Sequence, residues 1–562
     1  MSKKWVLREK ISDDLEKQLL FYRGIKTEEE AEKFFNPDYE RDLRDPFEFS
    51  EMEKITDRIV KAVKSDEKII IFGDYDADGI CSCAVFHDFF KKIGFENFWV
   101  YIPDRNKEGY GLNLNAIDEF IKQKVNLIIT VDCGITDYEE IKRAKNGGID
   151  VIVIDHHLIP AELPPAFAIL DPKIEGEDYP FKDFCGAGLA FKVVSALVKN
   201  EAFKIIPGWE KWFLDVVAIA TVADMFSLTD ESRIFVSCGL KVLKKTRRPG
   251  LLSLFKKLQI DKLNINEDDI GFLIAPCINV ASRFDHATIS FSLLTTDSNE
   301  EAEILSQKLV ETNNERKRVS EELFKKIDAD LSKVEKLPEV IVLGDESWQL
   351  GILPVLVNKV LEKYNRPVLL WGRGDADSEI KGSCRSNGRI NLVELLGEIG
   401  DKIFAEFGGH AVAAGFTVKE GKIKDLDKEV EKAYQNISHY EIEPSVLWLD
   451  AELNLENIDW NFVSFLDKFR PFGTGNPKPV FLLKNLEVWE ARVFGNEGIH
   501  IKLNFRKPSG EIVPAVGFFM AERFDFPLEK DARIDLAALV EKNIYNGSTE
   551  LRLRIVDIRP AQ

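Results

Sequence analysis

Short apolar runs alternate with amphipathic segments of helical length between residues 50 and 230. The runs 68–72 (KIIIF), 126–131 (NLIITV) and 150–154 (DVIVI) are rich in β-branched residues and almost entirely apolar. Such runs are typical of strands that are buried on both faces. Because segments with a helical pattern, such as AVFHDFFKKIG, separate them, we predict a parallel sheet with helices on both faces.

The pattern changes twice further along the chain. Residues 298–336 contain no glycine or proline and are rich in helix-forming residues, which predicts one long helix between two domains. The runs EVIVLG and RPVLLWG then begin a second α/β unit. After residue 443, apolar runs such as IHIKLNF and LRLRIVDI alternate with turn-like segments, which predicts a small β barrel.

We therefore expect an α/β protein that carries an additional barrel. Its first residues are polar with scattered aromatic side chains, and we expect them to form short helices that pack on the first domain. The predicted parts are 1–50 (N-terminal extension), 51–297 (first α/β domain), 298–336 (connecting helix), 337–442 (second, smaller α/β domain) and 443–562 (β barrel).

Composition narrows the class of protein. The 562 residues include 76 Lys and Arg against 96 Asp and Glu, a net charge of −20, which argues against a protein that simply coats nucleic acid. A local basic groove or a bound metal would still permit an anionic substrate. The seven cysteines form no CxxC pair, which favours a reducing compartment over a disulfide framework. No apolar run approaches about 18 residues, so we expect a cytoplasmic protein without membrane contact.

The stretch GDYDADG (73–79) places Asp74, Asp76 and Asp78 directly after the first predicted strand. The spacing resembles the first half of an EF-hand loop. That loop requires a glutamate at its twelfth position and a preceding helix, whereas Val85 and a predicted strand stand there. A polar turn without chemistry stays open for this stretch alone, since Asp and Gly are common in turns.

Other strand ends carry the same kind of side chain. The second strand is followed by Asp132 and the third by Asp155, His156 and His157, while Asp224 lies among apolar residues in TVADM. Ligands bind at the carboxyl edge of open α/β sheets. Converging carboxylates require cations or protons, and oxygen ligands with an imidazole suit Mn²⁺ or Mg²⁺. Two such ions about 3.5–4 Å apart can clamp a phosphoryl group and generate hydroxide.

These motifs, in the order GDYDADG, VDCG, DHH and TVADM, resemble those of the DHH phosphoesterases. FGGHAVAAGF (407–416) is similar to the motif of the DHH-associated domain, although a helix packing site made of small residues is another interpretation. Within that superfamily, IPDRNKEGYGL, PCINVASR, GSCRS and FRPFGTGNPKPVF resemble the RecJ family. The resemblance implies a parallel-sheet DHH catalytic domain, a long connecting helix, a smaller α/β DHH-associated domain and an OB-fold β barrel.

The resemblance also implies an activity. RecJ proteins are exonucleases that degrade single-stranded DNA from the 5′ end with two Mn²⁺ or Mg²⁺ ions, release mononucleotides and act in recombination and repair. A helicase and a single-strand-binding protein are candidate partners, and a monomer is expected. The alternatives are a DHH phosphodiesterase for short oligoribonucleotides or cyclic dinucleotides, and a non-catalytic nucleic-acid-binding scaffold.

Site roles follow from the motif positions in the same way. Asp132 would bridge both ions, Asp155 would orient the ligands, and His157 would contact the scissile phosphate or protonate the leaving oxygen. The implied metal ligands are Asp74, Asp76, Asp78, Asp132, His156 and Asp224. The implied catalytic residues are Asp76, Asp78, Asp132, His156, His157 and Asp224. The implied substrate-binding residues are Arg105, Tyr110, Asn279, Arg283, Arg385, Ser386, Gly408, Gly409 and His410.

Some positions depart from the family pattern or remain open. Gln349, Pro354 and Lys359 stand where a histidine, a glycine and an arginine are usual, which puts contacts of the second domain with substrate in doubt. Arg470 and Phe472 lie in the most distinctive stretch of the barrel region and are candidates for DNA contact. The basic run NNERKR (313–318) is interpreted as a solvated helix face rather than a DNA path.

Overall fold

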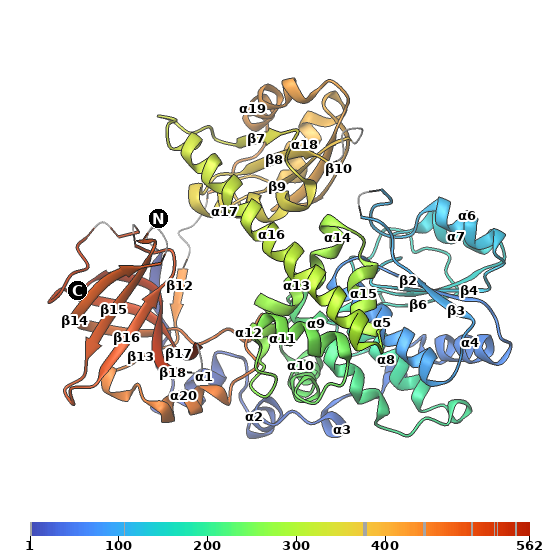
Figure 1. The fold of residues 1–562 in the computed structure, drawn as a ribbon, viewed down its shortest axis with the longest axis horizontal. Coiled ribbons are helices and arrows are strands. Elements are labelled where there is room, and N and C mark those ends of the chain that lie inside the picture. Colours follow the sequence, from blue (N-terminus) through green and yellow to red (C-terminus); the bar gives the residue numbers. More distant parts are fainter. Residues whose placement is uncertain are drawn as a thin grey trace.

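The computed structural model describes residues 3–105, 107–374, 379–441, 446–495, 498–521, 523–524, 526–545 and 548–561. Two α/β units and a β barrel are joined by helices and extended segments (Figure 1). The predicted boundary between residues 442 and 443 lies outside the described residues. Among the described residues, no helix combines the length and the apolar character that a membrane span requires.

The predicted parallel sheet is present. Its strand order is β3-β2-β4-β5-β6, and every neighbouring pair is parallel. The strands are β2 (Ile69–Gly73), β3 (Phe98–Tyr101), β4 (Leu127–Val131), β5 (Asp150–Ile154) and β6 (Ala168–Leu170).

Helices cover both faces of this sheet because its strands are apolar on both sides. Ile69 and Ile71 join a core with α5 (Ala77–Lys92) and α8 (Gly186–Val198). Ile70 and Phe72 join a second core with α6 (Leu114–Lys122) and α7 (Tyr138–Asn146). Successive side chains of a strand point to opposite faces, so one run of four apolar residues supplies both cores.

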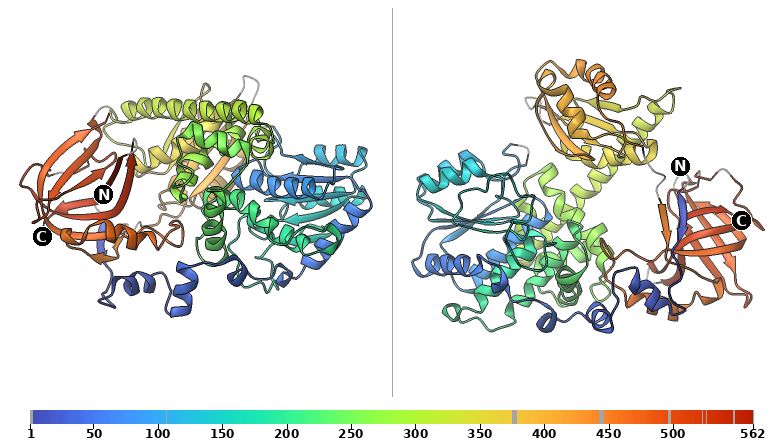
Figure 2. Two further views of the ribbon diagram at one scale, coloured as in Figure 1. Left: turned by 60° about the horizontal axis from the view of Figure 1, so that its bottom comes forward. Right: turned by 180° about the vertical axis from the view of Figure 1, so that it is seen from behind.

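Further helices follow the sheet and lead to the second unit. They include α9 (Leu214–Ala223), α10 (Asp230–Leu243), α13 (Ala275–Asn279) and α14 (Ala281–Phe284). The predicted connecting helix is α16, which runs from Asn299 to Leu331 and is capped by the Ser298 hydroxyl, an acceptor for the Glu301 N–H. It reaches the second unit, as two further views show (Figure 2).

The second unit contains a mixed sheet of order β10-β11-β9-β8-β7. Its strands are β7 (Ile341–Asp345), β8 (Val368–Arg373), β9 (Ile380–Arg385), β10 (Phe404–His410) and β11 (Ala413–Val418). The GGHAVAAG segment forms the β10–β11 hairpin, with Gly409 opposite Ala414. The alternative interpretation as a helix packing site is therefore wrong.

The C-terminal region is the predicted barrel. Five strands close through the additional β14–β17 pairing: β14 (Phe481–Phe494), β15 (His500–Arg506), β16 (Ile512–Gly517), β17 (Arg533–Tyr545) and β18 (Ser548–Pro560). Alternate residues such as Leu503 and Phe505 fill the interior. Closure removes free strand edges.

We predicted that the N-terminal extension packs on the first α/β unit, but much of it packs on the barrel region. Its strand β1 (Lys4–Leu7) pairs in parallel with β12 (Val446–Leu449) beside the barrel (Figure 2). Leu19, Leu20 and Phe34 join the barrel core, because that core offers these apolar side chains a place away from water. The later part of the extension contacts the first α/β unit, for instance through the ion pair of Arg44 with Asp230 at 2.6 Å.

Candidate active site

Three carboxylates lie in the turn between β2 and α5 and in the first turn of α5. Asp74 follows Gly73, and Asp76 is the N-cap of α5, where its Oδ1 accepts from the N–H groups of Asp78 (2.8 Å) and Gly79 (3.2 Å). Aspartate is favoured at this position because it satisfies such free donors. A Cβ atom at Gly79 would lie 2.4 Å from the Asp74 carbonyl oxygen, so the tight turn requires glycine.

Asp78 connects this helix to α8. Its side chain is buried, and its two oxygens accept from the N–H groups of Gly186 (2.6 Å) and Ala187 (2.7 Å) at the start of α8. The first N–H groups of a helix have no partner within the helix and favour an anion. A Cβ atom at Gly186 would lie 2.7 Å from Cβ of Asp132, so glycine allows α8 to approach the end of β4.

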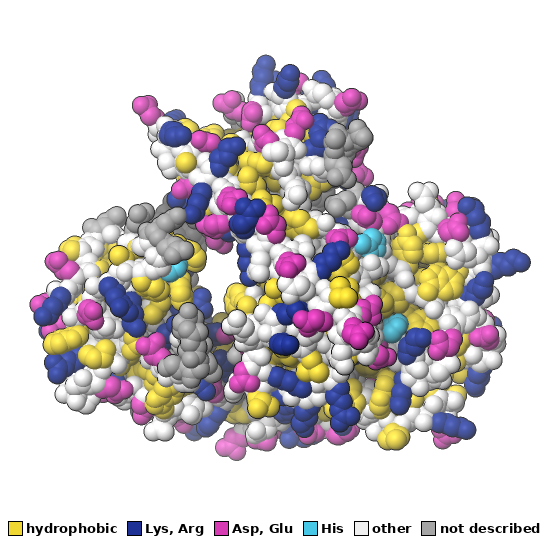
Figure 3. Space-filling view, in the orientation of Figure 1, with side chains coloured by type: hydrophobic (Ala, Val, Ile, Leu, Met, Phe, Trp, Pro, Cys, Tyr) yellow, Lys and Arg dark blue, Asp and Glu magenta, His cyan; other side chains and the backbone are white. Residues whose placement is uncertain are grey.

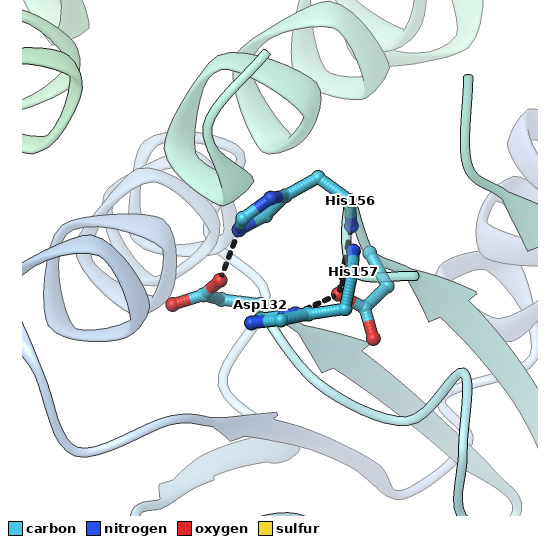
Figure 4. Close-up of side chains that lie close together, drawn as sticks. Asp132, His156 and His157 are labelled. Atoms are coloured by element: carbon cyan, nitrogen blue, oxygen red, sulfur yellow. Dashed lines mark hydrogen bonds and ion pairs between the residues drawn. The ribbon is translucent and has the colours of Figure 1, made fainter. Parts of the chain in front are cut away.

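The ends of β4 and β5 meet through Asp132 and His156. Asp132 has a φ of 61°, a left-handed conformation that is uncommon for residues other than glycine. Its Oδ1 lies 2.9 Å from Nε2 of His156, and the two side chains face each other in Figure 4. The same Nε2 lies 3.7 Å from Oδ2 of Asp78. Three neighbouring strands therefore bring their acidic and imidazole side chains to one place.

Asp155 holds His157 next to this cluster. Its Oδ1 lies 2.7 Å from Nδ1 of His157, and its Oδ2 accepts from the N–H of Ile135 at 3.0 Å. The Tyr110 hydroxyl lies 3.0 Å from the same Nδ1 and donates to the carbonyl oxygen of Asp132 at 3.2 Å. Tyr110 is 42% exposed, so it is no core residue. The contacts from Asp155 and from Tyr110 thus involve the same ring nitrogen of His157.

Two adjoining groups of potential metal ligands are built from carboxylates and His156. A third set, Asp132, Asp155, His156 and His157, overlaps both, but its Asp155 and His157 already bond to each other. In each group one ligand atom per residue lies within 4.8 Å of the others. Asp224 reaches the cluster from the end of α9, where it is the C-cap. The first group is Asp74, Asp76 and Asp132, and the second is Asp78, His156 and Asp224.

Burial and mutual repulsion change the protonation of these groups. Burial, followed by the charge of Asp76, raises the pKa of Asp74 to about 8 and that of Asp224 to about 7. Burial, followed by the charges of neighbouring carboxylates, also holds the pKa values of Asp78 and Asp132 well above their usual range. Burial and the neighbouring His157 ring lower the pKa of His156 to about 3.

This arrangement fits divalent cations. The Oδ1 atom of Asp74 is buried and has no hydrogen-bond partner among the described residues. Neighbouring carboxylates of this kind must take up protons or be compensated by a cation. Oxygen ligands with one imidazole, in which His156 is neutral, match the preferences of Mn²⁺ and Mg²⁺.

The predicted substrate residues of the first unit lie around the helix start. Asn279 accepts from the N–H of Ala77 at 2.7 Å and thereby holds α5 against α13. The Arg105 guanidinium carbon lies 4.9 Å from the centre of the Tyr75 ring. The Nη1 atom of Arg283 is buried without a hydrogen-bond partner among the described residues.

The predicted substrate residues of the second unit lie in a separate sheet. Arg385 ends β9, and the Ser386 hydroxyl donates to the Ile390 carbonyl within its own turn at 2.7 Å. Gly408, Gly409 and His410 are exposed at the end of the edge strand β10. No hydrogen bond or ion pair between described residues joins these five residues to the carboxylate cluster.

The departures from the family pattern have local explanations. Pro354 occupies the first turn of α17 (Leu353–Tyr364), where proline is tolerated. Lys359 forms an ion pair with Glu321 at 2.8 Å and so ties α17 to α16. Gln349 is exposed and lines a pocket of about 500 Å³ between α16 and the second unit, beside Trp348.

Arg470 and Phe472, the candidates for DNA contact, lie partly exposed where the barrel region meets the first α/β unit. Arg470 Nη1 pairs with Oε1 of Glu267 at 2.8 Å, and the Phe472 N–H donates to the same oxygen at 3.1 Å. The buried Arg233 of α10 donates to the carbonyls of Arg470 (2.7 Å) and Phe34 (2.9 Å). We call these five residues the barrel joint, because they fasten the barrel region to the catalytic domain.

Two residues beside the cluster were missed by the sequence analysis. Asp171 follows β6, is buried, and burial raises its pKa to about 7. The ammonium group of Lys173 donates to the carbonyl oxygen of His156. A strand end at AILDPK could have revealed both, but β6 has only three residues.

Comparisons with known proteins agree with this architecture. The model of the DHH family, N-terminal domain, matches residues 68–221, that of the DHHA1 domain matches 337–436, and that of the RecJ OB domain matches 449–557. The single-stranded-DNA-specific exonuclease RecJ of Bacillus subtilis is 35% identical over 542 residues, which cover 96% of this chain and 67% of that protein.

A relative of the same name from Thermus thermophilus is 30% identical and aligns over 89% of this chain and 69% of its own length. The crystal structure of RecJ in complex with Mn²⁺ from Thermus thermophilus superposes with a TM-score of 0.81 at 25% identity, covering 100% of this chain and 80% of that one. The same fold, the three matching domain models and the identity over nearly the whole chain lead to one conclusion: this protein belongs to the RecJ family.

Proposed function

We propose that this protein is a metal-dependent exonuclease that hydrolyses the phosphodiester bonds of single-stranded DNA. The observation that carries the proposal is the pair of adjoining ligand groups joined by the 2.9 Å contact between Asp132 and His156. The curated relatives named as single-stranded-DNA-specific exonucleases support the substrate, and the manganese-bound neighbour supports Mn²⁺ or Mg²⁺ as the cofactor.

Each group of ligands would hold one ion, and Asp132 lies where both groups meet. When bound, two divalent cations neutralise the carboxylates, polarise the phosphoryl group and lower the pKa of a water molecule. Asp78 and Asp76 are held in place by backbone N–H groups, so the carboxylates need little rearrangement to bind the ions.

His157 is the proposed proton donor. Burial opposes its charge, but the hydrogen bond and the charge of Asp155 outweigh this effect and raise its pKa. Because Asp155 and Tyr110 both engage Nδ1, the Nε2 atom stays available for the substrate. We expect it to contact the scissile phosphate or to protonate the leaving oxygen.

The barrel supports binding of a longer single strand. Trp489 is 42% exposed and lies beside the cationic groups of Arg506 (4.7 Å) and Lys530 (5.4 Å). Phe518 lies beside Arg552 and Arg554 in the same way. Exposed aromatic rings flanked by cations stack bases and attract the phosphate backbone. Both signs of charge are interspersed over the face in Figure 3, so binding depends on such local groups rather than on net charge.

The finer features of the activity follow the family resemblance. We propose degradation from the 5′ end, release of mononucleotides and a role in recombination and repair. We also propose a cytoplasmic monomer that works with a helicase and a single-strand-binding protein. The domain limits 51–297, 337–442 and 443–562 are proposed with them.

End-labelled DNA tests the proposal. Single strands that carry a label at the 5′ or the 3′ end are digested with Mn²⁺, beside a duplex and a dinucleotide. Early release of a 5′-labelled mononucleotide from the single strand is the expected result, with Asp76→Ala as an inactive control. Activity on the dinucleotide alone, or none on single strands, would contradict it.

A further inference from the structure

One arginine of the connecting helix α16 is turned partly away from solvent. The basic run 313–318 was interpreted as a solvated face, but Asn313 is buried and Arg316 is half-buried. The Asn313 side chain donates to the sulfur of Cys277 at 3.4 Å and accepts from Nε and Nη2 of Arg316 at 3.1 and 3.0 Å. Arg318 instead faces solvent and pairs with Glu315 and Glu322. The interpretation is therefore wrong for Arg316 and right for Arg318.

A chain of contacts leads from Arg316 to the carboxylate cluster. Cys277 belongs to α13, the helix whose last residue, Asn279, holds the N–H of Ala77. Arg283 lies four residues beyond Asn279 on α14, which packs against α16. Helix α13 thus contacts both α16 and α5, while α14 contacts α16.

Arg283 is half-buried, and its buried Nη1 atom has no hydrogen-bond partner among the described residues. Burial and then repulsion from Arg105 and Arg316 lower its pKa to about 10, although the charge of Asp76 acts in the opposite direction. None of these three arginines forms an ion pair with a carboxylate of the described residues, although the whole chain carries a net charge of −20. A partly buried cluster of like charges is unfavourable until an anion compensates it. Arginine forks suit phosphate oxygens, which can accept two hydrogen bonds from one guanidinium group.

We propose that Arg316 joins Arg105 and Arg283 to bind a backbone phosphate of the single strand next to the metal centre. The proposal rests on the proposed function and extends it, because it makes the connecting helix part of the substrate site. A phosphate held there lies beside Asp76, whose charge reaches Arg283, and so it orients the adjoining phosphodiester bond toward the carboxylates.

The alternative is a structural role in which Arg316 only supports Asn313. Two of its nitrogens donate to a single oxygen, so most of its hydrogen-bonding capacity stays unused in that role. Arg316→Gln separates the two roles, because glutamine keeps a donor for Asn313 and loses the charge. Arg318→Ala is the matched control, since it removes an equal charge from the solvent face of the same helix.

The test measures binding of a fluorescent oligothymidylate by anisotropy in the presence of a chelator, at several salt concentrations. For Arg316→Gln and Arg316→Ala we expect affinity to fall about 10- to 100-fold. The slope of log affinity against log salt should decrease by about 0.7, the contribution of one phosphate contact on a single strand. Arg316→Lys should retain the slope and lose part of the affinity.

Arg318→Ala should bind like the wild type within about twofold, since exposed ion pairs contribute little. Equal affinity and slope for Arg316→Gln and Arg318→Ala would overturn the inference while the wild type still bound and digested single strands. A wild type that neither bound nor digested single strands would instead overturn the proposed function. Far-ultraviolet circular dichroism shows whether each variant folds. If Arg316→Ala does not fold, the comparison of Arg316→Gln and Arg316→Lys with the wild type tests the inference.

Discussion

Asp155 accepts a hydrogen bond from Nδ1 of His157 at 2.7 Å, and this contact fixes both the direction and the charge of the imidazole. The Asp155 carboxylate is fully buried. Burial raises its pKa, but the hydrogen bonds from His157 and from the N–H of Ile135 outweigh burial, so that the pKa lies below its usual value. In this pair Asp155 orients the imidazole and His157 is the proton donor. We assign proton transfer to this pair and metal binding to the rest of the cluster.

Replacing Asp155 should therefore change the pH dependence of hydrolysis. In Asp155→Asn the imidazole loses the partner that raises its pKa, so less of it is protonated near neutral pH. We expect kcat to fall about 10- to 100-fold and the alkaline limb of the pH profile to move to lower pH. An unchanged profile with a reduced rate would indicate that His157 is not the proton donor.

Replacing each of the two neighbouring histidines should impair hydrolysis for a different reason. His157→Ala should lower kcat about 100- to 10,000-fold, as expected for loss of a general acid, and leave Mn²⁺ binding intact. His156→Ala should lose Mn²⁺, because its Nε2 lies between Asp132 and Asp78. Calorimetric titration with Mn²⁺ separates the cases, and loss of metal in the His157 variant would contradict the assignment.

The metal-free protein should lose stability as the pH rises. The pKa of Asp74 is about 8 in the folded protein against 3.8 for an ordinary aspartate. Between about pH 4 and about pH 8 the folded state keeps a proton that the unfolded state has released, so this contribution is present at low pH and lost as the pH rises through about 8.

Asn at this position cannot titrate. Thermal unfolding of the wild type and Asp74→Asn, followed in a chelator from acidic to alkaline pH, should show the wild type losing stability relative to the variant. Mn²⁺ should stabilise the wild type more at higher pH, since ligands release their protons on binding. A constant difference between the two proteins across this range would rule out a raised pKa for Asp74.

The barrel joint should govern how firmly the barrel is held. In Arg233→Ala the carbonyls of Phe34 and Arg470 lose a buried donor, which should lower the free energy of unfolding by about 3 kcal/mol. Limited proteolysis should then release the barrel region sooner than in the wild type. Arg247→Ala, which alters an exposed arginine of the same domain, should be cleaved at the same rate as the wild type. Equal cleavage rates for Arg233→Ala and Arg247→Ala would show that the barrel joint does not hold the barrel region in place.

Strand periodicity predicted much of the catalytic domain because β2, β4 and β5 are continuous apolar runs whose ends carry acids. The strand-end rule could thus place Asp132, Asp155 and their neighbours at one edge of the sheet from the sequence alone. It missed Asp171 and Lys173, since a strand of three residues has no readable period.

Tertiary packing decided the features that sequence patterns could not predict. The helix pattern of α16 could not show that Arg316 is half-buried and bonded to Asn313, because a charged residue is interpreted as solvated until its neighbours are known. The N-terminal strand β1 joined β12 more than 400 residues away, a pairing that local sequence does not encode. The charge of Arg470 suggested a contact with DNA, but this side chain forms an ion pair with Glu267 of the first α/β unit, which the local sequence could not show.

Mn²⁺ stoichiometry tests the central claim most directly: that four chain segments form one centre for two ions. Metal analysis of the protein after dialysis against Mn²⁺ should give two ions per chain for the wild type. Asp132→Asn, which alters the residue where both ligand groups meet, should retain fewer. A wild type that held no Mn²⁺, or an Asp132→Asn variant that held as many ions as the wild type, would contradict the account.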